Sequence, residues 1–280
     1  MCPVTFSEFR EVTITEVNQL ILHTSKKSCD LDLLPAFALN LCLNKLLPII
    51  TKRVNVSLQS GSVPDSLKIA LLSQLLKKIN MSYEEYCNLR PISNLTTVSK
   101  EIEKAAAVQL IQYLTENNLI EKFQSAYKSS HSTETALLEV QNNILQALDT
   151  RNSIILVLLD HSAAFDTVSH SKLLSRLFHH FCIRGRALKW FESYLSHRKQ
   201  LVHIDGCDST MRDLERGALQ GAVLGPLLYS FYTAPLADIA KQNNVRYHFF
   251  AEDIQLYVSF KVDIQLYVSF KEDIQLYVSF

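Results

Sequence analysis

The 280-residue chain lacks several features that would identify its class at once. Neither sign of charge dominates, because Lys plus Arg and Asp plus Glu both number 28. This balance gives no global electrostatic signature for nucleic acid, although it leaves room for a local one. No apolar run is long enough to span a membrane, and the first residues do not resemble a signal peptide. We therefore expect no membrane partner.

Cysteine is sparse and scattered. The six cysteines include no CxxC pair, which favours a reduced, intracellular protein. Nucleus and cytoplasm are not distinguished, because the pairs Lys26–Lys27 and Lys77–Lys78 are too short for a nuclear localisation signal. Hydrophobic residues make up 48% of the chain and charged residues 20%, as in an ordinary globular protein of one large domain or two small ones.

An apolar run from Ile154 ends at the acid Asp160. A run without alternation is typical of a strand buried on both faces. A charge at the end of such a strand is costly unless it is paired or holds a metal. Asp160 could therefore be a metal ligand, or it could be the N-cap of the following element.

Residues 247–260 predict a hairpin whose tip carries Glu252 and Asp253, because Ile254 to Phe260 alternate apolar and polar residues. Two acids at a hairpin tip are usually a solvated turn. Beside a third acid at a strand end, they would form a metal site.

Glycine is rare, yet three of the six glycines fall at Gly217, Gly221 and Gly225. Glycine allows close approach of the backbone to a ligand, but a glycine-rich entry into a helix needs no ligand. A second group of interest is basic: Arg184, Arg186, Lys189, Arg198 and Lys199. Such a run is either a solvated face or a local nucleic-acid contact.

Taken together, these segments resemble the reverse transcriptase domain of LINE-type retrotransposons, which lack long terminal repeats, and especially the chicken-repeat-like group. The resemblance runs from about Val12 to Phe260. It rests on five motifs in the family's order and spacing: RPISNL at 90–95, QSAYKSSHSTETAL at 124–137, LLDHSAAFDTV at 158–168, GALQGAVLGPLL at 217–228 and FAEDIQLY at 250–257.

The resemblance implies an α+β fold of the right-hand polymerase type. Its palm is an antiparallel sheet backed by helices, its fingers are helical, and no thumb is expected after the hairpin. The expected domains are a helical N-terminal extension (1–62), a fingers region (63–150), a palm (151–260) with inserted fingers helices (171–200) and a repeat tail (261–280).

The resemblance also implies the site. Asp160, Glu252 and Asp253 would be the catalytic acids and would bind two Mg²⁺ ions. Phe165 would lie against the sugar and exclude a 2′-hydroxyl, and Gln220 and Gly221 would contact template and incoming nucleotide. Arg90 and Lys128 would approach phosphates. The partners would be an RNA template, a DNA primer and deoxynucleotides, and no protein partner is evident.

Two departures from the family weaken the expected activity. Glu252 stands where the family has Asp, and its extra methylene moves the carboxylate, while the thumb that would clamp the primer–template duplex is missing. Lys128 also replaces an Arg, which keeps the charge but loses the bidentate fork. The polymerase reading therefore stands beside two others: a catalytically dead remnant that binds nucleic acid, and an unrelated two-metal enzyme.

The octapeptide DIQLYVSF occurs three times, at 253–260, 263–270 and 273–280. The step of ten residues keeps the same residues on one strand face in every copy, and no Gly, Asn or Pro separates the copies. We interpret the repeat as a tandem duplication and not as a functional module.

Each copy of the octapeptide combines high β propensity with little charge and no proline, which favours aggregation. We predict that deletion of Lys261–Phe280 raises the soluble yield without loss of cooperative unfolding. Solubility and thermal melts of the two chains test this. Unfolding of the shortened chain would show instead that the repeats are structural.

Overall fold

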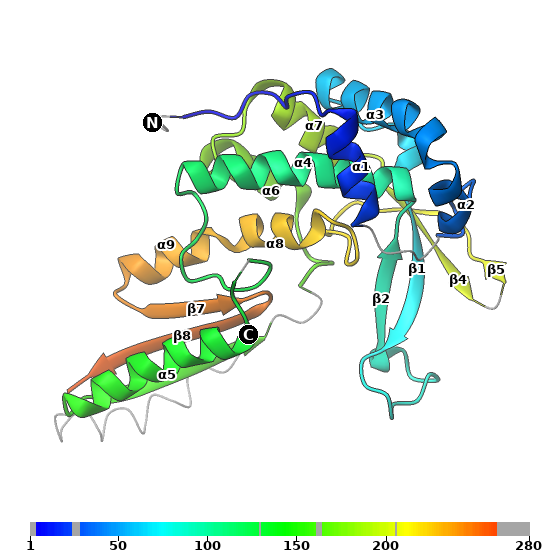
Figure 1. Ribbon diagram of the computed structural model, residues 1–280. Coiled ribbons are helices and arrows are strands. Elements are labelled where there is room, and N and C mark those ends of the chain that lie inside the picture. Colours follow the sequence, from blue (N-terminus) through cyan, green and yellow to red (C-terminus); the bar gives the residue numbers. More distant parts are fainter. Residues whose placement is uncertain (1–3, 24–28, 129, 161–163, 205, 262–280) are drawn as a thin grey trace. The chain divides into compact units, whose positions relative to one another are not determined.

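The computed structural model describes residues 4–23, 29–128, 130–160, 164–204 and 206–261 (Figure 1). The C-terminal octapeptide copies therefore lie outside the described residues. The chain divides into two compact units: residues 1–120 with 163–232, and residues 121–162 with 233–280. Helices and sheets occur in both units, as expected for a mixed fold.

The first unit is mainly helical. Its helices are α1 (Ile14–Leu22), α2 (Ala36–Leu41), α3 (Leu43–Ser60), α4 (Thr97–Glu116), α6 (His170–His179), α7 (Gly185–Leu195) and most of α8 (Gly225–Thr233). Thr13 caps α1 in a capping box with Glu16, a Thr and a Glu three residues apart being a sequence signature of a helix start. Gly61 ends α3 at φ 67°, a conformation that glycine adopts without strain.

Two prolines lie at different positions in their helices. Pro35 is the N-cap residue of α2. Pro48 lies inside α3, which begins at Leu43 and continues through the proline.

The core of the first unit surrounds Trp190 of α7. The indole is fully buried and stacks on Tyr194, with ring centroids 5.4 Å apart. Its Nε1 donates a hydrogen bond to Ser57 Oγ of α3 over 3.1 Å. Tryptophan is rarely buried completely unless its N–H finds an acceptor, so the single tryptophan joins α7 to α3.

The sheet of the first unit has the order β2-β1-β4-β5, and β6 pairs with β4. Its strands are β1 (Ile69–Leu76), β2 (Leu89–Asn94), β4 (Lys199–Ile204), β5 (Cys207–Asp208) and β6 (Arg212–Asp213). Short 3₁₀ helices at Asp65–Leu67 and Tyr86–Asn88 precede β1 and β2. Strand β1 runs antiparallel to β2 and parallel to β4.

The second unit is an antiparallel sheet of order β3-β8-β7 with helices packed against it (Figure 1). Its elements are α5 (Thr133–Asp149), β3 (Ser153–Asp160), α9 (Pro235–Gln242), β7 (Arg246–Phe250) and β8 (Asp253–Phe260). On one face, Tyr247, Phe249 and Ile254 pack against alanines of α9. On the other, Tyr257 Oη accepts a hydrogen bond from Asn143 of α5 over 3.1 Å.

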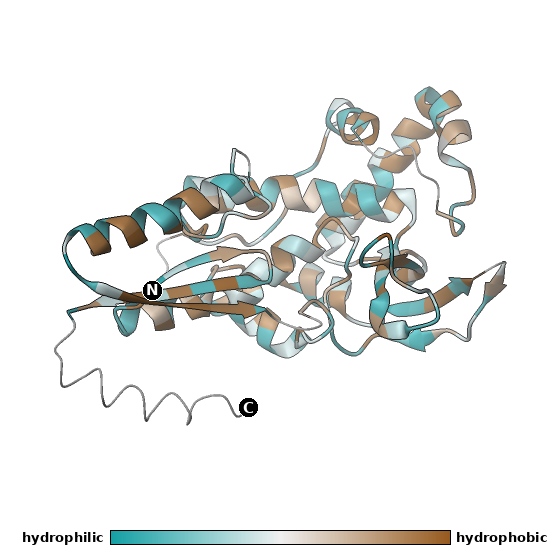
Figure 2. Ribbon diagram, turned by 90° about the horizontal axis from the view of Figure 1, so that it is seen from below, coloured by the Kyte–Doolittle hydropathy of each residue, from teal (hydrophilic) through white to brown (hydrophobic). Residues whose placement is uncertain are grey.

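Strand β3 is not buried on both faces, as its apolar sequence predicted. Leu158 is 68% exposed, and its neighbours from Leu156 to Leu159 are each more than 40% exposed. The reason is topological: β3 is an edge strand that pairs with β8. Figure 2 shows hydrophobic colour running along the strands of this sheet.

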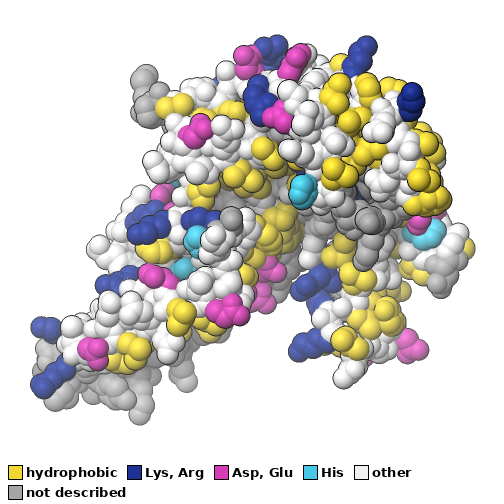
Figure 3. All heavy atoms as spheres, viewed as in Figure 1, with side chains coloured by type: hydrophobic (Ala, Val, Ile, Leu, Met, Phe, Trp, Pro, Cys, Tyr) yellow, Lys and Arg dark blue, Asp and Glu magenta, His cyan; other side chains and the backbone are white. Residues whose placement is uncertain are grey.

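A second exposed apolar surface belongs to the first unit. Phe37 and Leu41 of α2 are 70% and 83% exposed, and Figure 3 shows hydrophobic side chains gathered over α2 and the start of α3.

The helices in the described part of the chain include none with the length and hydrophobicity of a membrane span.

Four of the cysteines, Cys29, Cys42, Cys87 and Cys207, are free. Cys182 lies beside the amino-terminal segment, since Phe6 N donates to Cys182 O over 3.1 Å, and sequence spacing does not reveal that proximity.

A polar cluster ties the loop before α5 to α9 and β7. Glu121 accepts hydrogen bonds from Tyr247 Oη over 2.7 Å and from Lys241 Nζ over 3.0 Å. Burial acts to raise the pKa of Glu121, but these hydrogen bonds outweigh it and hold the pKa below its ordinary value of 4.5. The ionised carboxylate therefore stabilises the second unit.

Because the pKa of Glu121 is lower in the folded chain, its contribution is complete above the unfolded value near 4.5 and is lost as the pH falls below it. We predict that Glu121→Gln lowers the free energy of unfolding by about 1–2 kcal/mol at pH 7, and that the difference shrinks below pH 4.5. Urea melts from pH 3 to 7 measure this. The control Glu139→Gln alters a carboxylate that contacts Asn143 of its own helix, and an equal effect there would contradict the assignment.

Candidate active site

The strand pairing of the second unit sets two of the predicted acids opposite each other. Strands β3 and β8 pair through eight consecutive residues, and the last pair is Asp160 with Asp253. Directly opposed residues of an antiparallel pair project from the same face, with Cβ atoms about 4.5–5.5 Å apart. The two carboxylates, which are far apart in sequence, therefore lie side by side at the end of the sheet.

Solvent exposure changes the reason to expect a cation here. Asp160 and Asp253 are both exposed, and Glu252 is half-buried. The cost of burying a charge, which the apolar run before Asp160 suggested, therefore does not apply. What remains is repulsion, because like charges directly opposite each other destabilise a strand pair.

Two carboxylates, those of Asp160 and Asp253, are placed so that they could bind one hard divalent cation. Mg²⁺ binds through one or two carboxylates together with water and substrate phosphates, and a cation between Asp160 and Asp253 would remove their repulsion. Among the described residues, no group of three His, Cys, Asp or Glu side chains lies close enough to hold a metal ion. A joint site that also includes Glu252 stays a prediction.

The turn that carries Glu252 is strained. Phe250 pairs with Asp253, so Ala251 and Glu252 alone connect β7 to β8. Ala251 has φ 55°, in the left-handed region where a Cβ costs about 1–2 kcal/mol. Two-residue hairpin turns normally place Gly, Asn or Asp at such positions. Strain of this kind persists only where surrounding contacts hold it.

The Gln220–Gly221 segment of the first unit fits closely against β2. Gln220 O accepts a hydrogen bond from Ser93 N over 2.7 Å. Gly221 has φ 108°, and a Cβ there would lie 2.7 Å from Ser93 O. Glycine is therefore required at this position by the contact with RPISNL, which brings two of the sequence motifs together.

Phe165 belongs to the same unit and lies beside the glycine-rich segment. It is 8% exposed and stacks on Tyr229 of α8, with ring centroids 5.0 Å apart. Its carbonyl accepts a hydrogen bond from Ala218 N over 2.7 Å. The predicted contact of Phe165 with a sugar stays a prediction.

A pocket of about 400 Å³ opens where these segments of the first unit meet. Pro91 and Ser93 of β2, Asp166 and Gln220 are among its lining residues. Burial raises the pKa of the Asp166 carboxyl. A concave site with convergent polar groups is where a ligand is expected, and the pocket adjoins the segments that the sequence singled out.

The predicted phosphate contacts lie in different units. Arg90 is exposed on β2 of the first unit, whereas Lys128 is half-buried in the second. The basic group from Arg184 to Lys199 is divided between buried and exposed side chains. Arg198 is 2% exposed and Arg184 lies over the Phe178 ring, whereas Arg186, Lys189 and Lys199 are exposed.

A buried acid that sequence reasoning missed anchors the glycine-rich segment. Glu103 of α4 is 1% exposed, and its Oε2 accepts hydrogen bonds from Val223 N over 2.7 Å and Leu224 N over 3.2 Å. Its Oε1 accepts from Tyr194 Oη over 2.9 Å and lies 3.8 Å from Arg198. Burial raises the pKa of Glu103 in spite of these partners. No signal in the Ala-rich helix sequence distinguishes this acid from a solvated one.

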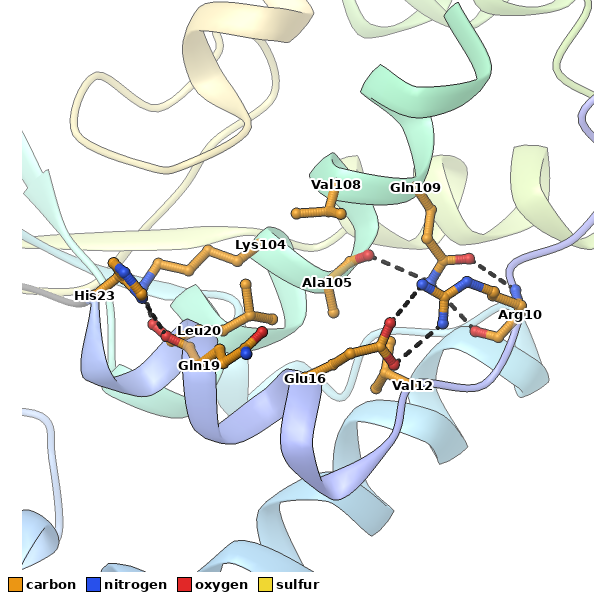
Figure 4. A pocket seen from close by; sticks show the side chains of 10 residues that line it. All are labelled: Arg10, Val12, Glu16, Gln19, Leu20, His23, Lys104, Ala105, Val108 and Gln109. Atoms are coloured by element: carbon orange, nitrogen blue, oxygen red, sulfur yellow. Dashed lines mark hydrogen bonds and ion pairs between the residues drawn. The ribbon is translucent and has the colours of Figure 1, made fainter. Parts of the chain in front are cut away.

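A second pocket, of about 370 Å³, lies between α1 and α4 (Figure 4). Its charges are paired inside the protein: Arg10 with Glu16, and Lys104 with Glu101 and the carbonyl of Leu20. The hydrogen bond from Arg10 and that from the Thr13 backbone lower the pKa of Glu16 to about 2. We assign no catalytic role to this pocket.

The repulsion between the opposed acids gives a direct test of their proximity. We predict that Asp160→Asn raises the free energy of unfolding by roughly 0.2–1 kcal/mol in the absence of divalent cations and at low salt. Urea melts measure the change. Asp30→Asn, in an exposed turn of the first unit, is the control, and equal stabilisation by both variants would show that Asp160 and Asp253 do not interact.

Comparison with known proteins agrees with the motif pattern. The family model "Reverse transcriptase (RNA-dependent DNA polymerase)" matches residues 76–274. The chain is 31% identical over 237 residues to the RNA-directed DNA polymerase from mobile element jockey of Drosophila funebris, covering 84% of this chain and 25% of the relative. It is 34% identical over 184 residues to the probable RNA-directed DNA polymerase from transposon BS of Drosophila melanogaster, covering 65% and 20%.

Among solved structures, an apo telomerase from Candida tropicalis aligns with a TM-score of 0.48 at 13% identity, covering 76% of this chain and 47% of that one. The chain spans a quarter or less of the two Drosophila relatives described above. The family match covers well over half of the chain and carries the assignment. The chain belongs to the reverse transcriptase family, as a domain of the LINE type.

Proposed function

We propose that this chain is the RNA-directed DNA polymerase domain of a retrotransposon enzyme and that it extends a DNA primer on an RNA template with deoxynucleotides. The observation that carries the proposal is the pairing of Asp160 with Asp253 at the end of the β3-β8-β7 sheet. In this proposal the sheet with α5 and α9 is the palm. The fingers boundaries expected from the sequence stay part of the proposal.

The two opposed carboxylates, together with Glu252, would hold two Mg²⁺ ions. Such a metal pair stabilises the attacking and leaving oxygens of an in-line phosphoryl displacement. The chain's own contribution is geometric: the register of β3 and β8 keeps the acids on one face, and the turn at Ala251 and Glu252 fixes the third carboxylate. Exposure of the acids leaves room for substrate phosphates.

The remaining residues would position substrate. Gln220 and Gly221 would contact template and incoming nucleotide, since Gly221 presents backbone without a side chain. Phe165 would limit the space at the sugar, and its stacking on Tyr229 would keep the ring in one orientation. Arg90 and Lys128 would approach phosphates, Arg90 through a bidentate fork and Lys128 as a point charge.

Primer extension tests the proposal. The assay is single-nucleotide incorporation by the 280-residue chain on an RNA template with an annealed DNA primer and Mg²⁺. We predict slow incorporation that Asp160→Asn abolishes and Asp149→Asn leaves unchanged. Glu252→Asp should raise the rate by up to about a hundredfold, because a misplacement of one ångström costs that much.

Incorporation that survives Asp160→Asn would overturn the proposed active site. Binding of the template–primer without any incorporation would favour the second candidate, a nucleic-acid-binding remnant without activity. The observation that favours it is the lack of a three-ligand metal group among the described residues. This second candidate predicts that the unmodified chain and the Glu252→Asp variant both bind template–primer without incorporating a nucleotide.

A further inference from the structure

The Gln124 side chain lies against the turn that carries the acids. Gln124 is the first residue of the QSAYKSS motif, the proposed function gives this residue no role, and it is 7% exposed. Its Oε1 accepts hydrogen bonds from Ala251 N over 3.2 Å and from Ala126 N over 3.0 Å. One buried amide oxygen therefore joins the motif loop to the first residue of the hairpin turn.

The backbone beside Gln124 holds the side chain at this place. Phe249 N donates to Phe123 O over 2.8 Å, and Ser125 N donates to Phe249 O over 3.0 Å. Ser125 Oγ and His248 Nε2 lie 2.9 Å apart. The loop thus forms a short parallel bridge with β7 on both sides of Gln124, so its side chain has little freedom to move away from the turn.

The turn needs such support. Ala251 has φ 55°, a conformation that residues with a Cβ avoid, and it immediately precedes Glu252 and Asp253. If the turn relaxed, the Glu252 carboxylate would change direction first, since Glu252 is the second residue of the two-residue connection. Asp253 is held in the β ladder opposite Asp160.

We propose that Gln124 is a positioning residue that holds the strained Ala251–Glu252 turn and thereby directs the Glu252 carboxylate. The proposal rests on the proposed function in one respect, the assignment of that carboxylate as a catalytic acid. The hydrogen bond to Ala251 N is the physical link. Any residue without an acceptor oxygen at position 124 leaves that amide without its partner.

Gln124→Met removes the acceptor and keeps the side-chain length. Amide exchange at Ala251 should then become about tenfold faster, the factor expected for loss of one hydrogen bond. Adding Ala251→Gly cannot restore that hydrogen bond, but it should restore Mg²⁺ binding and incorporation, because glycine adopts the turn conformation without strain. Recovery of function without recovery of amide protection separates release of a strained turn from general loss of packing.

Gln255→Met is the matched control. Gln255 lies on β8 of the same hairpin, and its Oε1 is buried without a hydrogen-bond partner. The control exchanges the same residue types in the same sheet, so it should leave exchange at Ala251 unchanged. If Gln124→Met fails to fold, Gln124→Glu keeps an acceptor oxygen and should preserve protection of Ala251.

Mg²⁺ titration and single-nucleotide incorporation provide the functional readout. Gln124→Met should weaken Mg²⁺ binding and lower incorporation by about tenfold to a hundredfold, with recovery in the double variant. Unchanged exchange at Ala251 in Gln124→Met, or equal effects of Gln255→Met, would overturn the proposal. A chain that binds no Mg²⁺ and incorporates nothing, yet shows the exchange pattern, would refute the proposed function while leaving the support of the turn by Gln124 in place.

Discussion

The candidate site depends on the register between β3 and β8. A slip of one residue would turn Asp160 and Asp253 to opposite faces, because side chains alternate along a strand. The octapeptide of β8 cannot set this register by itself, since its apolar alternation would fit equally after a shift of two residues. The hairpin fixes only the register of β8 against β7, because Ala251 and Glu252 alone connect the paired residues Phe250 and Asp253. The register of β3 against β8 is a separate constraint, held by eight consecutive residue pairs from Ser153–Phe260 to Asp160–Asp253.

Several unfavourable features gather in the second unit. Two carboxylates oppose each other, an alanine adopts a left-handed conformation, and an apolar edge strand is exposed. The first unit contains the larger buried core, with Trp190 and Phe191 fully buried. Each feature of the second unit lowers stability alone, yet the first two are consistent with a cation-binding hairpin, because binding a cation would offset the repulsion. In the proposed function, metal binding and stability are thus opposed at this hairpin, as at other sites where backbone strain is stored.

Local chemistry made much of this structure predictable. The strand that ends at Asp160, the acid-tipped hairpin and the start of α1 at Thr13 all follow from patterns within about ten residues. What could not be predicted depends on partners that are distant in the sequence. Exposure of Leu158 depends on β3 being an edge strand, and burial of Arg198 depends on Glu103 of another helix. The motif strings marked Gln124 but gave no reason for it. For Gly221 they implied a nucleotide contact, but not the packing against Ser93 O that also requires a glycine.

Gln124 and Glu103 each hold a loop in place, one in each unit, by accepting hydrogen bonds from backbone N–H groups. In each case one buried side-chain oxygen accepts two backbone N–H groups, and at least one of these comes from the loop that carries candidate site residues. An apolar side chain could fill either space at less desolvation cost, and replacement of buried ionic groups by apolar ones is often neutral for stability. Apolar packing, however, is non-directional and tolerates small shifts of a loop. A hydrogen bond to a specific amide does not, since it weakens steeply with angle and distance. Polar anchors at these two positions therefore fix loop geometry more narrowly than apolar packing would, which is the property that a site for metal ions and nucleotides requires.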